Sequence, residues 1–598
     1  MKKNVLTAIV PFLPFWFFPS LRPAPVRARS ERVLVVASLL PGTLADFARS
    51  VTVVTRDEID RLGATSIADV LKYCVGLDVQ ERGPNGAQAD LSIRGATFQQ
   101  VLVLVDGSPY GDLQTGHHNL DAPVPTADIE RVEILRGPGS ALFGPGALGG
   151  LVNIVTRTAA SGRLKGELRA SDFRTTSASL AWDVAAERIS NVLSLGVDSS
   201  DGFIADRDYK LWQVADRLSV NAGRGRIEGF AGFGRKEFGA LDFYTPGLGL
   251  PSREWTRTAF AEAKYEGPVG SLKLTDRVYF RSHFDRFILD RRAPSYYLNE
   301  TTNTSWGTNF ILKTNDWAVG LDAERGAVDS SKIGRHADIR AALFAEYRRD
   351  LGKDASINFG LRQDYHATYG ASLSPSVAVQ WRISPGLSWR ASVGHSFRAP
   401  SYTELYYRDP ANEGNAGLAP ETAWSADTGC NLRLGRILAA GLTVFFRAER
   451  NAIDWIRRMG GPWRAENIRR VKAAGLEFDA SVETGPLRLG LNQTFMAAED
   501  AGPDVVYKYG FRYPQSQGAV VLNAGLARGL SLNLRLNHKK RLHQRAYAVL
   551  DASLTARIPG RSEIFLEAAN LLNAAYEDIP GVRLPGRWVG AGLRFDIR

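Results

Sequence analysis

Two adjacent histidines and a group of aspartates are the side chains whose types and spacing could do chemistry. His117 and His118 lie in the polar segment TGHHNLD, residues 115–121. Imidazole nitrogens ligate transition metals such as cobalt and iron, so the pair is a candidate contact for a metal-bearing ligand, together with Tyr110 and Asn119. Adjacent histidines in a polar segment are also often solvent-facing or hydrogen-bonded to neighbours, and the sequence leaves both interpretations open.

The aspartates belong to the acidic segment DSSDGFIADRD, residues 198–208. Carboxylate oxygens at this spacing can hold calcium, although the segment lacks the EF-hand pattern. We therefore consider a calcium site here and, as the alternative, an ordinary solvated loop. The four candidate ligands are Asp198, Asp201, Asp206 and Asp208.

Catalytic patterns are missing from the sequence. The histidines are dispersed except for the pair above, and no HExxH, GxSxG or SxxK motif occurs in a supporting context. With no nucleophile beside a base, the sequence predicts a protein that is not an enzyme and requires no cofactor.

Bulk composition excludes other classes. The net charge is +11, but the lysines and arginines are scattered without a basic run, so we expect a solvated or lipopolysaccharide-facing surface and no nucleic-acid partner. The mean hydropathy of −0.17 is too low for a bundle of membrane helices. Cys74 and Cys430 lie far apart without metal-ligand spacing, and a disulfide between them stays open.

The N-terminus predicts export. Lys2 and Lys3 precede an apolar run, residues 5–18, and VRA at residues 26–28 offers a cleavage site after Ala28. No later stretch reaches about 18 uninterrupted apolar residues, so no transmembrane helix is expected. No cysteine follows the apolar run, which disfavours a lipoprotein. We expect a signal peptide over residues 1–28 and a mature chain that is soluble or a membrane β-barrel.

The next segment alternates strands and short helices. Residues 51–54 predict a strand, and Thr55 can cap a helix with acidic residues in its first turn. Thr65 or Ser66 caps a second helix, which Gly76 ends. The apolar residues on one face of that helix are Ile67, Val70, Leu71 and Cys74.

Strands follow at residues 91–94 and 101–105, and Asp106-Gly107 marks a tight turn. The glycine-rich stretch 128–157 then combines a strand, one helical turn and a second apolar strand, crowded closely together. These elements predict a small mixed α/β module over residues 50–158.

The remainder of the chain alternates apolar and polar residues with a period of two. Leu476 and Phe478 alternate with Glu477 and Asp479, and residues 487–492 and 532–537 repeat the pattern. This alternation fits a barrel with lipid outside and water inside, although soluble sandwiches also alternate. About 440 residues follow the module, which at ~20 residues per strand and turn gives about 22 strands.

Several motifs resemble TonB-dependent outer-membrane receptors. LSIRGATFQQVLVLVDGSPY (91–110) and DIERVEILRGPGSALFGPGALGGLVNIVTR (128–157) resemble the signature of the plug domain of that family. Four later motifs resemble its barrel strands, at residues 393–407, 414–429, 466–480 and 570–595. The resemblance implies an all-β membrane barrel of about 22 antiparallel strands, residues 159–598, around a mixed α/β plug. One departure is the C-terminus, where Phe595 rather than the last residue supplies the usual closing aromatic.

The resemblance also assigns roles. Val33, Leu34, Val35, Val36 and Ala37, within a periplasmic tail over residues 29–49, resemble the TonB box, whose backbone can add as a strand to a partner's sheet. The alternatives are the first strand of the plug and the tail of the leader. Arginines at two plug motifs and carboxylates at two barrel motifs imply a latch between plug and barrel, and solvated arginines are the alternative. The implied latch residues are Arg94, Arg136, Asp427 and Glu477.

The function implied by the resemblance is active import of a scarce, bulky, metal-bearing nutrient across the bacterial outer membrane. The expected partners are TonB, outer-membrane lipid and lipopolysaccharide, and a downstream periplasmic binding protein; a monomer is expected. FGALDFYTPG (238–247) and the acidic segment resemble the cobalamin receptors, which carry calcium-binding aspartates. Cobalamin is therefore the first expectation for the ligand. A ferric siderophore and a passive binding or adhesion barrel are the alternatives.

Overall fold

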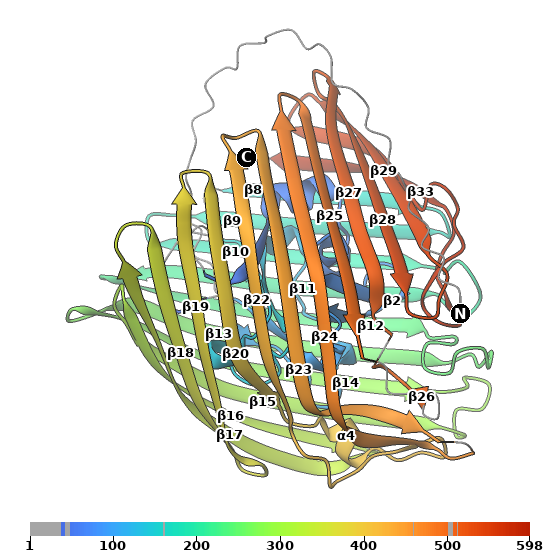
Figure 1. Ribbon diagram of the computed structural model, residues 1–598. Coiled ribbons are helices and arrows are strands. Elements are labelled where there is room, and N and C mark those ends of the chain that lie inside the picture. Colours follow the sequence, from blue (N-terminus) through green and yellow to red (C-terminus); the bar gives the residue numbers. More distant parts are fainter. Residues whose placement is uncertain are drawn as a thin grey trace, which may run out of the picture. The chain divides into compact units, whose positions relative to one another are not determined.

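The computed structural model describes residues 38–41, 48–159, 162–458, 460–499, 506–510 and 512–597. The predicted signal peptide and the predicted TonB box, Val33 to Ala37, lie outside these residues. The described residues belong to one compact unit with two parts. An N-terminal plug of mixed secondary structure, blue in Figure 1, lies within a barrel of long strands.

The plug contains two sheets and three short helices. Its main sheet has the strand order β1-β6-β7-β4-β5, and β2 pairs with β3 as a separate hairpin. The elements are β1 (Ser50–Thr55), α1 (Arg56–Leu62), α2 (Ile67–Leu71), β2 (Leu77–Gly83), β3 (Gln88–Ile93), β4 (Val101–Val105), β5 (Ser108–Pro109), β6 (Ile129–Arg136), α3 (Ser140–Phe143) and β7 (Gly150–Thr156). The predicted mixed α/β character is confirmed.

Capping side chains explain where the first two helices begin. Thr55 and Glu58 form a reciprocal capping box at α1, and Ser66 with Asp69 forms another at α2. Each box satisfies backbone N–H groups that have no partner within the helix. The prediction that Thr55 caps the first helix is confirmed, and of the two candidates for the second helix Ser66 is the cap.

The second helix is shorter than predicted, because it ends at Leu71 instead of running to Gly76. Gly76 has φ 77° and faces the barrel wall. A Cβ at this position would lie 2.3 Å from Oε1 of Glu477. Glycine is therefore required here for close approach to the wall and not as a helix stop.

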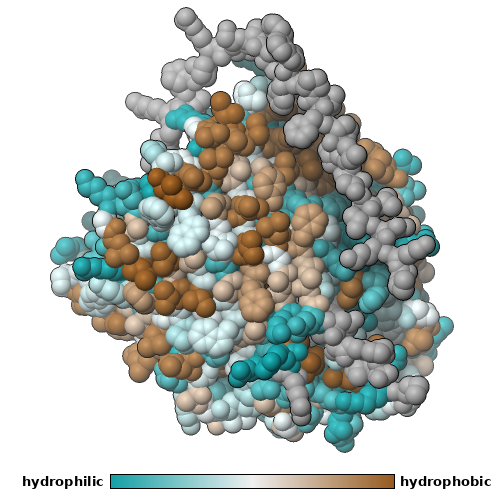
Figure 2. Space-filling view, in the orientation of Figure 1, coloured by the Kyte–Doolittle hydropathy of each residue, from teal (hydrophilic) through white to brown (hydrophobic). Residues whose placement is uncertain are grey.

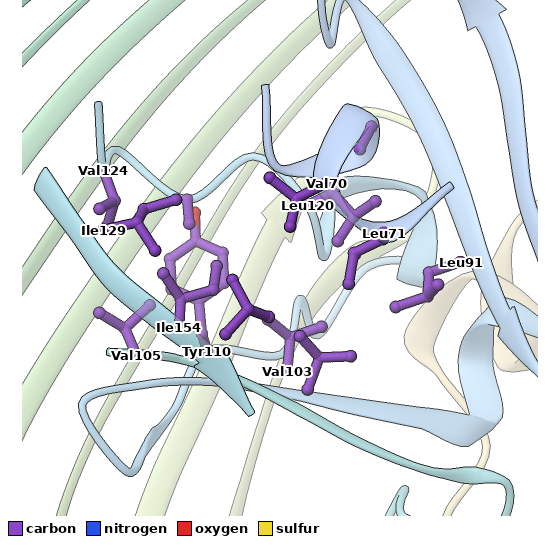
Figure 3. Packing of buried hydrophobic residues seen from close by; sticks show 14 of the residues in the cluster. Val70, Leu71, Leu91, Val103, Val105, Tyr110, Leu120, Val124, Ile129 and Ile154 are labelled. Carbon is purple, nitrogen blue, oxygen red and sulfur yellow. The ribbon is translucent and has the colours of Figure 1, made fainter. Parts of the chain in front are cut away.

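The plug has its own apolar core, which continues onto the wall. Val70 and Leu71 of α2 are fully buried, and Figure 3 shows the ring of Tyr110 among aliphatic side chains of the sheet. Phe230 and Phe260 of the barrel belong to the same cluster. Full burial of one such aliphatic side chain stabilises the fold by about 1.5–3 kcal/mol.

Twenty-two long antiparallel strands close the barrel, and two strands of two residues, β21 (Asn412–Glu413) and β26 (Val506–Tyr507), pair at its rim. β33 pairs with β8 and so joins the end of the barrel to its beginning. The long strands are β8 (Arg163–Ser171), β9 (Thr175–Ala185), β10 (Ile189–Ser200), β11 (Tyr209–Ala222), β12 (Gly225–Gly239), β13 (Arg253–Val269), β14 (Leu272–Ile288), β15 (Leu298–Lys313), β16 (Trp317–Ser330), β17 (Gly334–Leu351), β18 (Ala355–His366), β19 (Gly370–Ser384), β20 (Leu387–Arg398), β22 (Glu421–Leu434), β23 (Leu438–Arg457), β24 (Trp463–Thr484), β25 (Leu487–Ala498), β27 (Pro514–Ala527), β28 (Leu530–Arg541), β29 (Tyr547–Ile558), β30 (Ser562–Ala569) and β33 (Trp588–Ile597).

The predicted alternation is confirmed and separates the two faces of the wall. On β24, Leu476 and Phe478 are each 38% exposed on the outside, whereas Glu477 between them is 1% exposed and points inward. Figure 2 shows hydrophobic residues gathered over the strands of this face. Large apolar side chains exposed around the barrel include Trp182, Trp212, Trp306, Trp381 and Trp424. This pattern is typical of a lipid-facing surface with aromatic girdles.

The two ends of the barrel differ. Short turns such as residues 270–271 and 435–437 close one end, and long connections such as residues 240–252 and 399–420 close the other. The latter connection carries the short helix α4 (Tyr402–Tyr406). In outer-membrane barrels short turns face the periplasm and long loops face outward, which defines the outer end used below. Among the described residues, no helix is both long and apolar enough to cross a membrane.

Candidate functional site between plug and barrel

Arg94 joins the plug to the barrel wall. It follows β3 with φ 51°, and its buried guanidinium donates to both oxygens of Glu477, from Nε to Oε1 at 2.8 Å and from Nη2 to Oε2 at 2.9 Å. Its Nη1 donates to Oδ2 of Asp427 at 3.2 Å. Bidentate pairing of arginine with carboxylate is among the stronger polar contacts in proteins and fixes geometry as well as charge.

Two further arginines complete this cluster. Arg136, at the end of β6, donates to Oε2 of Glu477 at 3.1 Å, and Arg390 of β20 donates to Oδ1 of Asp427 at 3.1 Å. The structure therefore brings together Arg94, Arg136, Asp427 and Glu477, and it adds Arg390, which the sequence did not single out. All five are buried. Removal of one partner would leave an uncompensated buried charge, so the cluster is suited to hold the plug and to release it when disturbed.

A second ion cluster, which the sequence analysis missed, lies nearer the outer end. Arg541 donates to both oxygens of Asp78 in β2, at 2.6 and 2.7 Å, and to Oδ1 of Asp578 at 3.0 Å. Lys539 lies 3.2 Å from Asp78 and 3.1 Å from Asp578. Although burial raises it, these cations hold the pKa of Asp78 below its usual value. Strand alternation places Lys539 and Arg541 on the inner face, but no local pattern names their partners.

His117 is buried and hydrogen-bonded. Its Nδ1 lies 2.7 Å from Oδ1 of Asp90, which also accepts from Arg82 at 2.6 Å through its other oxygen. Burial lowers the pKa of His117, and although burial raises the pKa of Asp90, Arg82 and His117 hold it at about 2. The ring of His117 stacks on Phe98 with 4.2 Å between centroids. Its hydrogen bond to Asp90 orients this imidazole.

The other predicted ligand contacts lie against the wall. His118 is buried, with Nδ1 at 3.3 Å from Oδ2 of Asp121. Burial lowers its pKa, but the hydrogen bond to Asp121 and nearby carboxylates outweigh burial and raise the pKa of His118 to about 10. Asn119 accepts from the backbone N–H of Asp112 at 2.9 Å. Tyr110 is fully buried beneath Arg281.

These placements favour one of the two interpretations that the sequence leaves open, that the histidines are hydrogen-bonded to their neighbours. Residues 115–121 contain a short 3-10 helix, Gly116–His118, which packs against β3. Its polar side chains are satisfied by buried aspartates, which makes projection into solvent unnecessary. Of the predicted ligand contacts, His117 is the residue that borders the outer aromatic residues described next.

Aromatic and basic side chains cover the outer surface of the plug. Tyr509 and Tyr244, from outer loops, lie 5.6 and 6.1 Å from the ring of His117. Lys508 lies over the rings of Tyr509 and Trp455, at 5.6 and 5.5 Å. The sequence does not reveal this surface, because aromatic residues that lie far apart in the chain form no local sequence pattern. We call it the outer aromatic surface, and its members are Phe98, His117, Tyr244, Trp455, Lys508 and Tyr509.

The space at this surface is small. A cavity of ≈ 40 Å³ is lined by residues of the plug and of the loop that carries Tyr509. One water occupies about 30 Å³ of liquid volume, so the cavity has room for water and not for a bulky nutrient.

The four aspartates of the acidic segment have separate partners. Asp198 is buried on β10 and accepts from Asn85 at 3.3 Å. Each of the other three pairs with its own arginine: Asp201 with Arg174, Asp206 with Arg291 and Asp208 with Arg253. Among the described residues these aspartates form no group close enough to share an ion. The arrangement does not supply the shared ligand set that the calcium hypothesis requires, because arginines neutralise the carboxylates individually.

Comparison with known proteins identifies a family whose profiles match this chain. The profile of the TonB dependent receptor-like beta-barrel matches residues 156–571, and that of the TonB-dependent receptor plug domain matches residues 43–151. The chain is 24% identical to the vitamin B12 transporter BtuB of Photobacterium profundum over 608 residues, covering 96% of each protein. It is also 24% identical to the same transporter of Vibrio vulnificus over 515 residues, covering 79% of each.

Solved structures share the fold. The siderophore receptor PirA from Pseudomonas aeruginosa is 20% identical with a TM-score of 0.72, covering 92% of this chain and 99% of that one. The FrpB iron transporter from Neisseria meningitidis is 16% identical with a TM-score of 0.76, covering 92% and 100%. The barrel profile alone spans more than half of the sequence, and the strands close as that profile implies; this chain therefore belongs to the TonB-dependent receptor family of the bacterial outer membrane.

Proposed function

We propose that this receptor imports cobalamin from the outer surface of the cell to the periplasm. The observation that carries the proposal is the likeness to vitamin B12 transporters along 96% of both chains. The resemblance of residues 238–247 to the cobalamin receptors points the same way. TonB-dependent transport follows from membership of the family, and the identity of the nutrient is the proposal.

The buried ion clusters explain why such transport needs work. Arg94 and Arg136 hold the plug to the wall through Glu477, and Arg541 holds it through Asp78. Separating buried pairs of this kind costs free energy, because each charge loses its hydrogen-bonded partner in a confined space. The outer membrane has no ATP, so we propose that TonB pulls on residues 33–37 and thereby separates the plug from these partners. A periplasmic binding protein would then accept the nutrient from a monomeric receptor.

A ferric siderophore is the second candidate. The outer aromatic surface combines aromatic rings with Lys508, and Arg82, which is paired with Asp90, lies beside it at 5.5 Å from the ring of Tyr244. Aromatic rings and cations suit anionic metal chelates that carry aromatic groups. This observation favours a chelate of negative charge, whereas the relationship to vitamin B12 transporters favours cobalamin.

Ligand titration of the detergent-purified receptor separates these candidates. The fluorescence of the 12 tryptophans would be followed while cobalamin and a panel of ferric siderophores are added, each with and without calcium. Saturable quenching by cobalamin at submicromolar concentration supports the proposal. Binding of a siderophore with no response to cobalamin contradicts it and selects the second candidate. Replacement of Trp455 by Phe should reduce the signal if the ligand meets the outer aromatic surface.

A further inference from the structure

We propose that one divalent transition-metal ion binds between the plug and the wall, held by His118, Asp121 and His283. Ligand atoms of these three residues lie within 4.8 Å of one another, and those of His118, Glu254 and Asp285 form an overlapping group. All five side chains are buried. The site lies at the outer end of β13 and β14, beneath the plug segment 115–121.

His283 provides the first reason. Its Nδ1 lies 2.8 Å from Oγ1 of Thr258, and its Nε2 is buried without a hydrogen-bond partner among the described residues. A metal-bound histidine typically uses one nitrogen for the ion and the other for a hydrogen bond to oxygen, which fixes the ring. His283 already has the hydrogen bond to oxygen, through Nδ1, and its Nε2 is left without a partner among the described residues.

Charge balance provides the second reason. Four buried carboxylates face the group: Asp112, Asp121, Glu254 and Asp285. Arg281 pairs with Asp112 and Lys236 pairs with Asp121, whereas Glu254 and Asp285 have no salt bridge among the described residues. Glu254 accepts from the hydroxyl of Tyr244, and Asp285 accepts from the side-chain amide of Gln114. With both imidazoles neutral, as ligands must be, one divalent cation balances the two remaining negative charges.

The donor set indicates the class of metal. Two imidazoles with carboxylates suit zinc, cobalt, nickel or ferrous iron, whereas calcium and magnesium prefer oxygen ligands alone. Tetrahedral zinc with bonds of about 2.0–2.1 Å places its ligands roughly 3.3–3.5 Å apart. Nδ1 of His118 and Oδ2 of Asp121 are already 3.3 Å apart. The ligand atom of His283 lies within 4.8 Å of both, so the three donors converge on one small volume.

The bound ion would tie the plug segment to the wall, since His118 and Asp121 belong to the plug and His283 to β14. It is a bare cation, distinct from the bulky nutrient proposed above. Its existence does not depend on whether that nutrient is cobalamin.

The test uses the tag-free full-length receptor in detergent, stripped of metal with a chelator and titrated with Co²⁺. We expect saturable visible absorption typical of nitrogen-coordinated Co²⁺ at one ion per chain, reversed by Zn²⁺ and unaffected by excess Ca²⁺. His283→Gln should weaken binding by about 100-fold or more, because losing a ligand costs at least as much as losing its hydrogen-bonded neighbour. Hydrogen exchange in residues 115–121 should slow when the ion binds.

Matched variants keep the test decisive. His117→Gln changes a neighbouring buried histidine that pairs with Asp90, so its Co²⁺ affinity should stay unchanged. Thr258→Val keeps every ligand and all of the side-chain volume, and should weaken binding by about 10–100-fold. Folding of the His283→Gln variant is judged by the shift in its electrophoretic mobility on heating. If that variant fails to fold, the Co²⁺ affinity of the Thr258→Val variant provides the test. Absence of saturable binding, or equal loss in His117→Gln and His283→Gln, overturns the proposal.

Discussion

Nε of Arg94 lies 2.8 Å from Oε1 of Glu477, a contact that joins plug to barrel across 383 positions of the sequence. Glu477 also accepts from Arg136, so one carboxylate serves two plug arginines. The consequence is an asymmetry. Loss of the carboxylate leaves Arg136 without its salt bridge and Arg94 with Asp427 alone, whereas loss of either arginine leaves the other paired with Glu477.

This asymmetry predicts a rank order for substitutions in the cluster. Glu477→Gln should lower the free energy of unfolding of the plug by about 3–5 kcal/mol, and Arg136→Gln should lower it by less. Urea unfolding combined with hydrogen exchange of β3 and β6 peptides measures both effects. A lipid-facing substitution on the same strand, Leu476→Ala, serves as the control. The latch hypothesis is wrong if reversing the charges at Arg94 and Glu477 leaves both plug stability and transport unchanged.

Deletion of Val33–Ala37 should abolish uptake and leave ligand binding intact. The reason is that binding uses the outer face, whereas energy enters through this segment. Uptake of labelled cobalamin by cells that express the receptor is measured alongside binding to their outer membranes. The control variant has the sequence of residues 42–46 scrambled. A five-residue deletion in a periplasmic turn would not be a suitable control. Normal uptake by the deletion variant would favour the passive-barrel alternative.

The two cysteines should differ in reactivity. Both are free; Cys74 is buried in the plug and Cys430 is exposed on β22. Burial raises the pKa of Cys74 to about 12, so almost no thiolate forms near pH 8. N-ethylmaleimide should add once to the folded receptor in detergent and twice after denaturation, as read by intact mass. Cys430→Ser identifies the reactive site, and rapid alkylation of Cys74 in the folded protein would contradict its position in the core.

The carboxylate of Glu81 should make the plug sensitive to pH. Glu81 is buried on β2, 2.7 Å from Lys72, and burial raises its pKa from 4.5 to about 7 despite that cation. Because the folded-state pKa is raised, its contribution to stability is fully present below pH 4.5 and is lost as the pH rises through 7.

Glu81→Gln should remove this dependence. The stability of the variant relative to wild type should rise by up to about 1.4 kcal/mol per pH unit across that interval. Hydrogen exchange of α2 and β2 at a series of pH values provides the measurement. A difference that stays constant from pH 4 to pH 8 would show that Glu81 does not titrate in the folded plug.

Local sequence was sufficient to predict the helices and strands of the plug and to predict which side chains of the barrel strands face inward or outward. The hydroxyl of Thr55 and the turn at Asp106-Gly107 act on adjacent backbone, so their positions follow from a few residues. Period-two alternation likewise placed Glu477 inside and Phe478 outside. Resemblance to a family, and not periodicity, named the four latch residues.

Pairing across the lumen could not be predicted in this way. Alternation shows that Arg541 points inward, but its partners, Asp78 and Asp578, depend on strand register and on how the plug is seated. The same limit applied to His118: its partner Asp121 is close in sequence, but the nearby Glu254 and Asp285 come from β13 and β14 of the barrel. The calcium hypothesis stays a prediction. The arginines that pair with Asp206 and Asp208 lie 85 and 45 positions away in the sequence, so these pairs likewise could not be named from local sequence.

The pairing of β33 with β8 makes completion of the chain a condition for sealing the wall. Phe595 lies opposite Gly166, whose missing side chain leaves room for the ring. Without residues 588–597, the folded wall would have two bare sheet edges, β8 and β30, prone to pair with other chains. A chain truncated before β33 would therefore form an open, aggregation-prone sheet and not a slightly smaller pore.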